Sequence, residues 1–161
     1  NYTASDEEPE QRLSYFREDI GLNSHHWHWH TVFPHLGSKE MVEKDRRGEM
    51  FYFMHQQILA RYNVERFCHN MGEVKPLNDL REEIVEGYFP KLLNSSNNRT
   101  YPGRVPRSKL QDIDRNGEKV LISDLEYWRD RILEAIDRDY LIDVGHKYAD
   151  CDFNNMYVFS G

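Results

Sequence analysis

Four histidines fall within six residues, in the run His25-His26-Trp27-His28-Trp29-His30. Neutral imidazole is a common protein ligand for copper, zinc and other transition metals. If the run is helical, His26 and His30 are four residues apart, so they project from one face about one turn from each other. His25 and His28 form a competing pair on a different face. The run therefore predicts a helix that carries part of a metal site.

A third ligand is expected from a second helix, where residues 51–62 show an apolar stripe at helical spacing. The stripe consists of Phe51, His55, Ile58, Leu59 and Tyr62. A lone histidine is more often an ordinary hydrogen-bonded residue than a ligand, but this one lies on a stripe that should face the core. We therefore predict a three-nitrogen metal site formed by His26, His30 and His55.

The neighbours of these three histidines are interpreted as supporting residues. We predict that His25 and His28 donate hydrogen bonds behind the ligands or pack the helix. The aromatic neighbours are predicted to be core packing residues, and they are Trp27, Trp29 and Phe51. Three other charged residues of the second helix are explained by helix electrostatics rather than catalysis, and they are Glu49, Arg61 and Glu65. The remaining histidines lie beside loop, helix-end or tail signals and are His35, His69 and His146.

Helices are predicted on both sides of one irregular region. Helical spacing from Gln11 is interrupted at Gly21, so Asn23 or Ser24 should cap a helix that runs to Phe33 and stops before Pro34. A loop at residues 34–44 should follow, and the longest helix should begin at residue 45 or 46. This helix should be buried on most sides over residues 50–54. It should end near residue 70, with Gly72 as its stop.

A third helix should run over residues 123–142, where Ser123 and Glu126 make a capping box. Prolines and a polar run make residues 73–118 irregular, with room for a short helical turn over residues 80–85. The predicted fold class is all-α, a helical-bundle lobe with a long loop-rich insertion.

Composition excludes several kinds of partner. The net charge of −7 argues against nucleic acid, and no apolar run approaches the roughly 20 residues that cross a bilayer. Cys68 and Cys151 do not make a disulfide framework, and Cys68 is predicted to be a buried free thiol. Sequons at Asn94 and Asn98 are candidate glycosylation sites that favour an extracellular setting. The start at Asn1 leads us to expect a processed or partial sequence.

The ligand set narrows the choice of metal. Three imidazoles without thiolate or carboxylate fit copper or zinc. No Asp or Glu lies at the His-Glu-x-x-His spacing that supplies the base of a metalloprotease, which weakens a hydrolase interpretation. An apolar, histidine-only site suits copper that reacts with dioxygen. A mononuclear zinc hydrolase stays open as an alternative, and esterase activity with zinc would support it.

The sequence resembles the arthropod hemocyanin and prophenoloxidase superfamily, the type 3 copper proteins. The matching strings are Tyr15-Phe-Arg-Glu-Asp-Ile-Gly21, the histidine run, Asp45-Arg-Arg-Gly-Glu49, residues 51–63 and Trp128-Arg-Asp-Arg-Ile-Leu-Glu-Ala-Ile136. The resemblance places the family's copper A ligands on His26, His30 and His55. It implies that residues 16–143 form the copper A lobe of the central domain, after a linker at residues 1–15 and before a divergent tail at 144–161.

Within the superfamily, strings such as Glu86-Gly-Tyr-Phe-Pro-Lys91 are similar to phenoloxidases, whereas Ser24 is a departure associated with hemocyanins. The resemblance implies an extracellular hemolymph enzyme that uses dioxygen and two coppers to hydroxylate monophenols and oxidise o-diphenols to quinones, for melanin synthesis and innate immune defence. It further implies a hexamer. An oxygen-transporting hemocyanin and a non-catalytic metal-binding fragment stay open as alternatives, whereas the intact histidines disfavour the storage hexamerins.

The second copper site needs further histidines after about residue 145, where this sequence has only His146. The resemblance therefore implies a half-site: one copper here, two in the intact parent. We expect the isolated chain to have little or no phenoloxidase activity.

Overall fold

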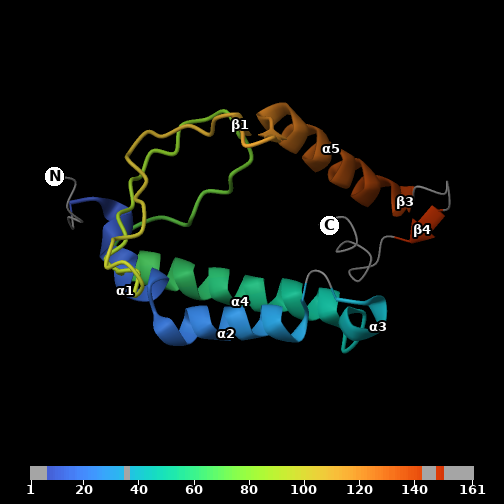
Figure 1. Ribbon diagram of the computed structural model, residues 1–161, viewed down its shortest axis with the longest axis horizontal. Helices are drawn as coiled ribbons and strands as arrows, with labels where there is room; N and C mark the ends of the chain where they lie inside the picture. Colours follow the sequence, from blue (N-terminus) through green and yellow to red (C-terminus); the bar gives the residue numbers. More distant parts are fainter. Residues whose placement is uncertain (1–6, 35–36, 143–147, 151–161) are drawn as a thin grey trace. The chain divides into compact units, whose positions relative to one another are not determined.

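The computed structural model describes residues 7–34, 37–142 and 148–150. Contacts group the chain into two units, the first made of residues 1–25 and 59–112 and the second of residues 26–58 and 113–161. Helices dominate and each sheet has only two strands, which confirms the all-α class (Figure 1). The two long helices, α2 (Ile20–Val32) and α4 (Arg47–Cys68), contribute residues to both units. Within the second unit they lie side by side.

Helix α2 begins at Ile20, three to four residues before the predicted start. The prediction was wrong because Asp19 is the cap: its carboxylate accepts a hydrogen bond from the Leu22 amide at 2.7 Å. Asn23, expected to cap the helix, instead donates its side-chain amide to the carbonyls of Arg17 and Asp19, at 3.0 and 2.8 Å. Upstream, Pro9–Leu13 forms the 3-10 helix η1 and Ser14–Arg17 the short helix α1.

The other helix boundaries agree in part with the sequence predictions. Helix α4 matches within two residues at each end, whereas α3 (Lys39–Val42) lies in the segment predicted to be a loop. Helix α5 (Ile122–Arg138) begins before Ser123, and Asp124 rather than the predicted Ser123 and Glu126 pair makes the capping bond, accepting from the Leu121 amide at 3.2 Å. It ends early because Asp139 turns left-handed (φ 59°) and strand β3 (Tyr140–Ile142) then pairs with β4 (Tyr148–Asp150).

The irregular region folds back on itself in two antiparallel arms. Isolated bridges join Ile84 to Ser108, Tyr88 to Arg104 and Leu93 to Thr100, so the predicted helical turn over residues 80–85 does not form. A hairpin that the sequence analysis missed follows, with β1 (Ile113–Arg115) paired to β2 (Glu118–Val120). Its turn is Asn116-Gly117, both at positive φ (57° and 81°), which is the strongest short hairpin signal in a sequence.

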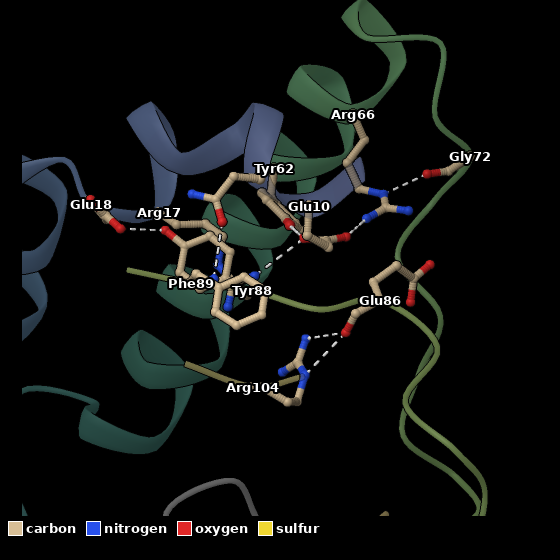
Figure 2. A network of polar contacts seen from close by, with 11 residues as sticks. Glu10, Arg17, Glu18, Tyr62, Arg66, Gly72, Glu86, Tyr88, Phe89 and Arg104 are labelled. Atoms are coloured by element: carbon tan, nitrogen blue, oxygen red, sulfur yellow. Dashed lines mark hydrogen bonds and ion pairs between the residues drawn. The ribbon is translucent and has the colours of Figure 1, made fainter. Parts of the chain in front are cut away.

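A buried carboxylate organises the first unit, and no sequence prediction identified it. Glu10, 7% exposed, forms an ion pair with the equally buried Arg66, accepts the Tyr62 hydroxyl, and lies 3.3 Å from an Arg17 guanidinium nitrogen (Figure 2). Arg66 also donates its Nε hydrogen to the Gly72 carbonyl at 2.6 Å. We call Glu10, Arg17, Tyr62 and Arg66 the Glu10 network. It joins η1 and α1 to the end of α4. The last residues of the predicted N-terminal linker therefore belong to the fold of the first unit.

The same short helices also fix the irregular region. The Tyr88 hydroxyl and the Lys91 amide both donate to Glu18, at 2.7 and 2.8 Å, and the Phe89 amide donates to Gln11 at 3.0 Å. The Arg17 guanidinium lies 3.7 Å from the centre of the Tyr88 ring. Burial and the bond to Glu18 raise the pKa of Tyr88. Residues 88–91 are therefore held against the helices of the first unit.

Stability at alkaline pH should depend on Tyr62. Burial, followed by the hydrogen bond to Glu10, raises the pKa of Tyr62 from 10.0 to about 12. Above pH 10 the unfolded chain therefore loses this proton while the folded chain keeps it, so the stabilisation is complete below pH 10 and is lost as the pH rises towards 12. We expect urea unfolding to show that the wild type loses stability relative to Tyr62→Phe over this range. A difference independent of pH would contradict the assignment.

Two predictions about burial were wrong. The first turns of α4 were expected to be buried on most sides, yet Met50, Tyr52 and Phe53 are 48%, 50% and 56% exposed. Cys68, expected to be a buried thiol, is exposed. Over residues 50–54 only Met54 is buried, at 8% exposed.

No helix within the part of the chain that the structure describes is long and apolar enough to cross a membrane.

Candidate metal centre

His26 and His30 project from one face of α2, as their spacing predicts. Their Nε2 atoms are 3.2 Å apart and their ring centroids 4.8 Å apart. Both side chains are half-buried, whereas His25 and His28 on the other faces of the helix are exposed. The fold thus separates the two competing histidine pairs of the run, sheltering the pair with four-residue spacing.

His55 reaches the same place from α4. Its ring meets the edge of the His26 ring with centroids 5.4 Å apart. Its Nδ1 lies 2.8 Å from the Phe51 carbonyl oxygen, one turn earlier in the helix. Because a carbonyl only accepts hydrogen bonds, Nδ1 carries the proton and Nε2 keeps the lone pair that could bind a metal. The bond therefore selects the tautomer in which the Nε2 atom of His55 is free of a proton.

Aromatic side chains line the histidines on one side. The Trp29 ring contacts His30 at 5.3 Å, Phe33 at 5.0 Å and Phe51 at 5.4 Å between centroids. Trp29 and Phe51, predicted to be core residues, are half-buried, whereas Trp27, predicted to be a core residue as well, is 71% exposed. The two tryptophans differ because they point to opposite sides of α2.

The pair on α2 has the spacing that a metal requires. Two nitrogens bound to one ion at about 2.0–2.1 Å in tetrahedral geometry would be about 3.3 Å apart, close to the separation of His26 and His30. Across the described ranges, however, no three His, Cys, Asp or Glu side chains converge closely enough to hold a metal as they stand. His55 touches the pair through the His26 ring, and its nitrogen does not complete the set in this arrangement.

A second group of titratable side chains lies near the end of α4. The Tyr15 hydroxyl donates to Glu65 at 2.5 Å and lies 3.3 Å from the His69 Nε2. The bond between Tyr15 and Glu65 raises the pKa of Tyr15 and lowers that of Glu65. Arg61 pairs with Glu65 at 2.5 Å across one turn, and Glu49 pairs with Arg46. These contacts agree with helix electrostatics as the role of Glu49, Arg61 and Glu65.

The chain resembles known proteins both in sequence and in structure. Residues 1–156 match the family model described as hemocyanin, copper containing domain. The chain is 53% identical over 144 residues to phenoloxidase 8 of the mosquito Anopheles gambiae, and this match covers 88% of the chain but 21% of that protein. The chain thus spans about a fifth of the length of this curated relative.

Two solved structures show the same fold at lower identity. A hemolymph-type prophenoloxidase from a crustacean is 39% identical with a TM-score of 0.81, over 92% of this chain and 22% of that one. A scorpion hemocyanin in its activated state is 39% identical with a TM-score of 0.78, over 94% of this chain and 24% of that one.

Proposed function

This chain belongs to the family of copper-containing hemocyanin domains, and from that membership we propose that His26, His30 and His55 hold one copper ion. The observation that carries the proposal is the 3.2 Å separation of the His26 and His30 Nε2 atoms, with His55 in ring contact beside them. The proposal requires the third nitrogen to move towards the other two, because the three do not converge in this arrangement of the described residues. The family's metal is copper, which agrees with an all-imidazole ligand set.

The residues around the ligands prepare the site in ways that do not depend on the metal being bound. The Phe51 carbonyl holds the proton on Nδ1 of His55 and so leaves Nε2 as the donor atom. Trp29 and Phe51 cover one side of the histidines with hydrocarbon and limit the access of water. Copper, when bound, supplies the redox chemistry with dioxygen.

We propose that a longer protein containing this domain is a phenoloxidase, acting on monophenols and o-diphenols. The support comes from sequence identity, because the mosquito phenoloxidase is 53% identical. The two solved structures do not discriminate, since the crustacean prophenoloxidase and the scorpion hemocyanin are both 39% identical. A hemocyanin-type oxygen carrier is therefore the second candidate. Secretion into hemolymph, assembly into hexamers, and roles in melanin synthesis and immunity belong to this proposal.

Catechol oxidation by the longer protein tests this function. We expect His26→Ala/His30→Ala to lower the rate by more than about a hundredfold, since even partners of metal ligands contribute about 10–100-fold. The matched control is His25→Ala/His28→Ala. The sequence predicts a supporting role for these two histidines, but they are exposed on other faces of α2, so their removal should leave the rate nearly unchanged. Reversible dioxygen binding without turnover of catechol would instead identify a carrier. Ester hydrolysis with zinc and no preference for copper would overturn both.

The isolated chain should have little or no activity on catechol. It supplies one group of three histidines, whereas the chemistry implied by the resemblance uses two coppers. Catechol oxidation by the copper-loaded chain at a rate comparable to an intact phenoloxidase would contradict the half-site proposal.

A further inference from the structure

Five aromatic side chains of the second unit, three of them the proposed copper ligands, form a closed cycle of ring contacts. The successive centroid distances are 4.8 Å from His26 to His30, 5.3 Å from His30 to Trp29, 5.4 Å from Trp29 to Phe51, 3.9 Å from Phe51 to His55, and 5.4 Å from His55 to His26. Three members come from α2 and two from α4. Two of the five, Trp29 and Phe51, carry no metal-binding atom. Trp29 contacts His30, Phe51 contacts His55, and the two rings contact each other.

We propose that Trp29 and Phe51 are positioning residues, which keep the His30 and His55 side chains packed beside His26 before copper arrives. This inference rests on the proposed copper site. The two rings act as one unit because they touch each other across the gap between α2 and α4. Movement of one ring therefore displaces the ligand that contacts the other.

Phe51 acts on His55 in two separable ways. Its carbonyl accepts the Nδ1 hydrogen, and its ring lies against the His55 ring at 3.9 Å, with the ring planes tilted by 35°. The two residues are four apart, so their side chains lie one above the other on the same helix face. A substitution at Phe51 leaves the carbonyl in place, because the carbonyl belongs to the backbone. Such a variant therefore isolates what the ring contributes.

Trp29 is placed by ring packing rather than by its polar atom. The indole N–H is buried and has no hydrogen-bond acceptor among the residues described. A buried donor without an acceptor is unfavourable, so this position gains from the tryptophan only through its ring contacts. Those contacts are edge-to-face with His30, at an interplanar angle of 89°, and tilted against Phe51 and Phe33. Aromatic pairs in such geometries are stabilised beyond the effect of the area that they bury.

Copper affinity of the chain, measured by competition with a chelator of known affinity, tests the proposal. Phe51→Leu and Trp29→Leu should each weaken the affinity by about tenfold or more, the effect typical of losing a partner of a metal ligand. Phe51→Tyr and Trp29→Phe keep an aromatic ring and should stay within about threefold of the wild type. The matched control is Phe53→Leu, two residues along α4, where the side chain is 56% exposed.

The double variant tests whether the rings act as one unit. Side chains in contact give non-additive effects, so Trp29→Leu/Phe51→Leu should weaken copper binding little more than either single change. Additive losses would overturn the coupling. A second readout is the hyperfine splitting in the electron paramagnetic resonance spectrum of the Cu(II)-loaded chain, which should change with Phe51→Leu but not with Phe53→Leu. If Phe51→Leu does not fold, Phe51→Met removes the ring and introduces a flexible side chain that adapts to the space left behind.

The outcomes separate this inference from the proposal on which it rests. If the unaltered chain binds no copper, or if His26→Ala/His30→Ala binds it equally well, the copper site itself is wrong. If copper binds and depends on His26 and His30, but Phe51→Leu and Phe53→Leu behave alike, the site stands and the positioning role is overturned.

Discussion

Copper bound to the isolated chain should fall from about one ion to none when His26 and His30 are both replaced by alanine. Two of the three proposed ligands are then missing, and the remaining imidazole of His55 cannot hold the ion alone. Loss of a residue that merely supports a ligand weakens metal binding by about 10–100-fold, so loss of two ligands should exceed that range. Copper per chain, measured after removal of weakly bound ions, checks the result.

The control uses the competing histidines of the same run. His25→Ala/His28→Ala removes the same number of imidazoles from the same helix, at exposed positions, and should leave the bound copper unchanged. Loss of copper in this control, with retention in His26→Ala/His30→Ala, would place the site on the wrong face of α2. Circular dichroism of both variants shows whether the helices remain.

Replacement of Glu10 by alanine should destabilise the chain by about 3–5 kcal/mol, the typical effect of removing one partner of a buried ion pair. The change leaves the Arg66 guanidinium buried without its carboxylate and also removes the acceptor of the Tyr62 hydroxyl. The free energy of unfolding in urea measures the loss. If the variant does not fold at all, the loss of helical signal in its far-ultraviolet circular dichroism spectrum shows the destabilisation directly.

Glu134→Ala is the matched control, because it breaks an ion pair with Arg138 whose side chains are 46% and 51% exposed. An exposed pair one turn apart contributes only about 0.3–0.5 kcal/mol. The double variant Glu10→Leu/Arg66→Met should recover part of the loss, since an apolar pair can replace a buried ion pair more favourably than either charge can remain alone. Equal small effects of Glu10→Ala and Glu134→Ala would contradict a central role for the Glu10 network.

The sequence predicted the features that depend on local periodicity. The spacing of His26 and His30 sets the face they share, and the stripe from Phe51 to Tyr62 sets the helix that carries His55. Both are properties of a single helix, so they can be read along the chain. The structure adds the hydrogen bond that selects the His55 tautomer and the ring that Trp29 and Phe51 complete.

The features that the sequence analysis did not predict have two causes: local signals that were not used, and contacts between residues far apart in the sequence. Asp19 was overlooked as a cap because Gly21 was interpreted as an interruption, although a single glycine costs a helix only about 1 kcal/mol. The turn at Asn116-Gly117 was likewise a local signal that was not used. The burial of Glu10 has no local signal, since its partners Tyr62 and Arg66 are more than fifty residues away. A carboxylate in a polar N-terminal segment gives no sign of burial until distant partners are placed beside it.

The exposed thiol of Cys68 affects how copper binding by this chain is to be measured. Thiolate is a soft donor, so Cu(I) prefers it to imidazole. An accessible cysteine also joins two chains through a disulfide in air. Copper counted on the native sequence would therefore include ions scavenged by sulfur, and reducing agents added to prevent dimers would compete for the metal. A background in which serine replaces both cysteines removes both artefacts, so that a copper titration no longer includes thiolate.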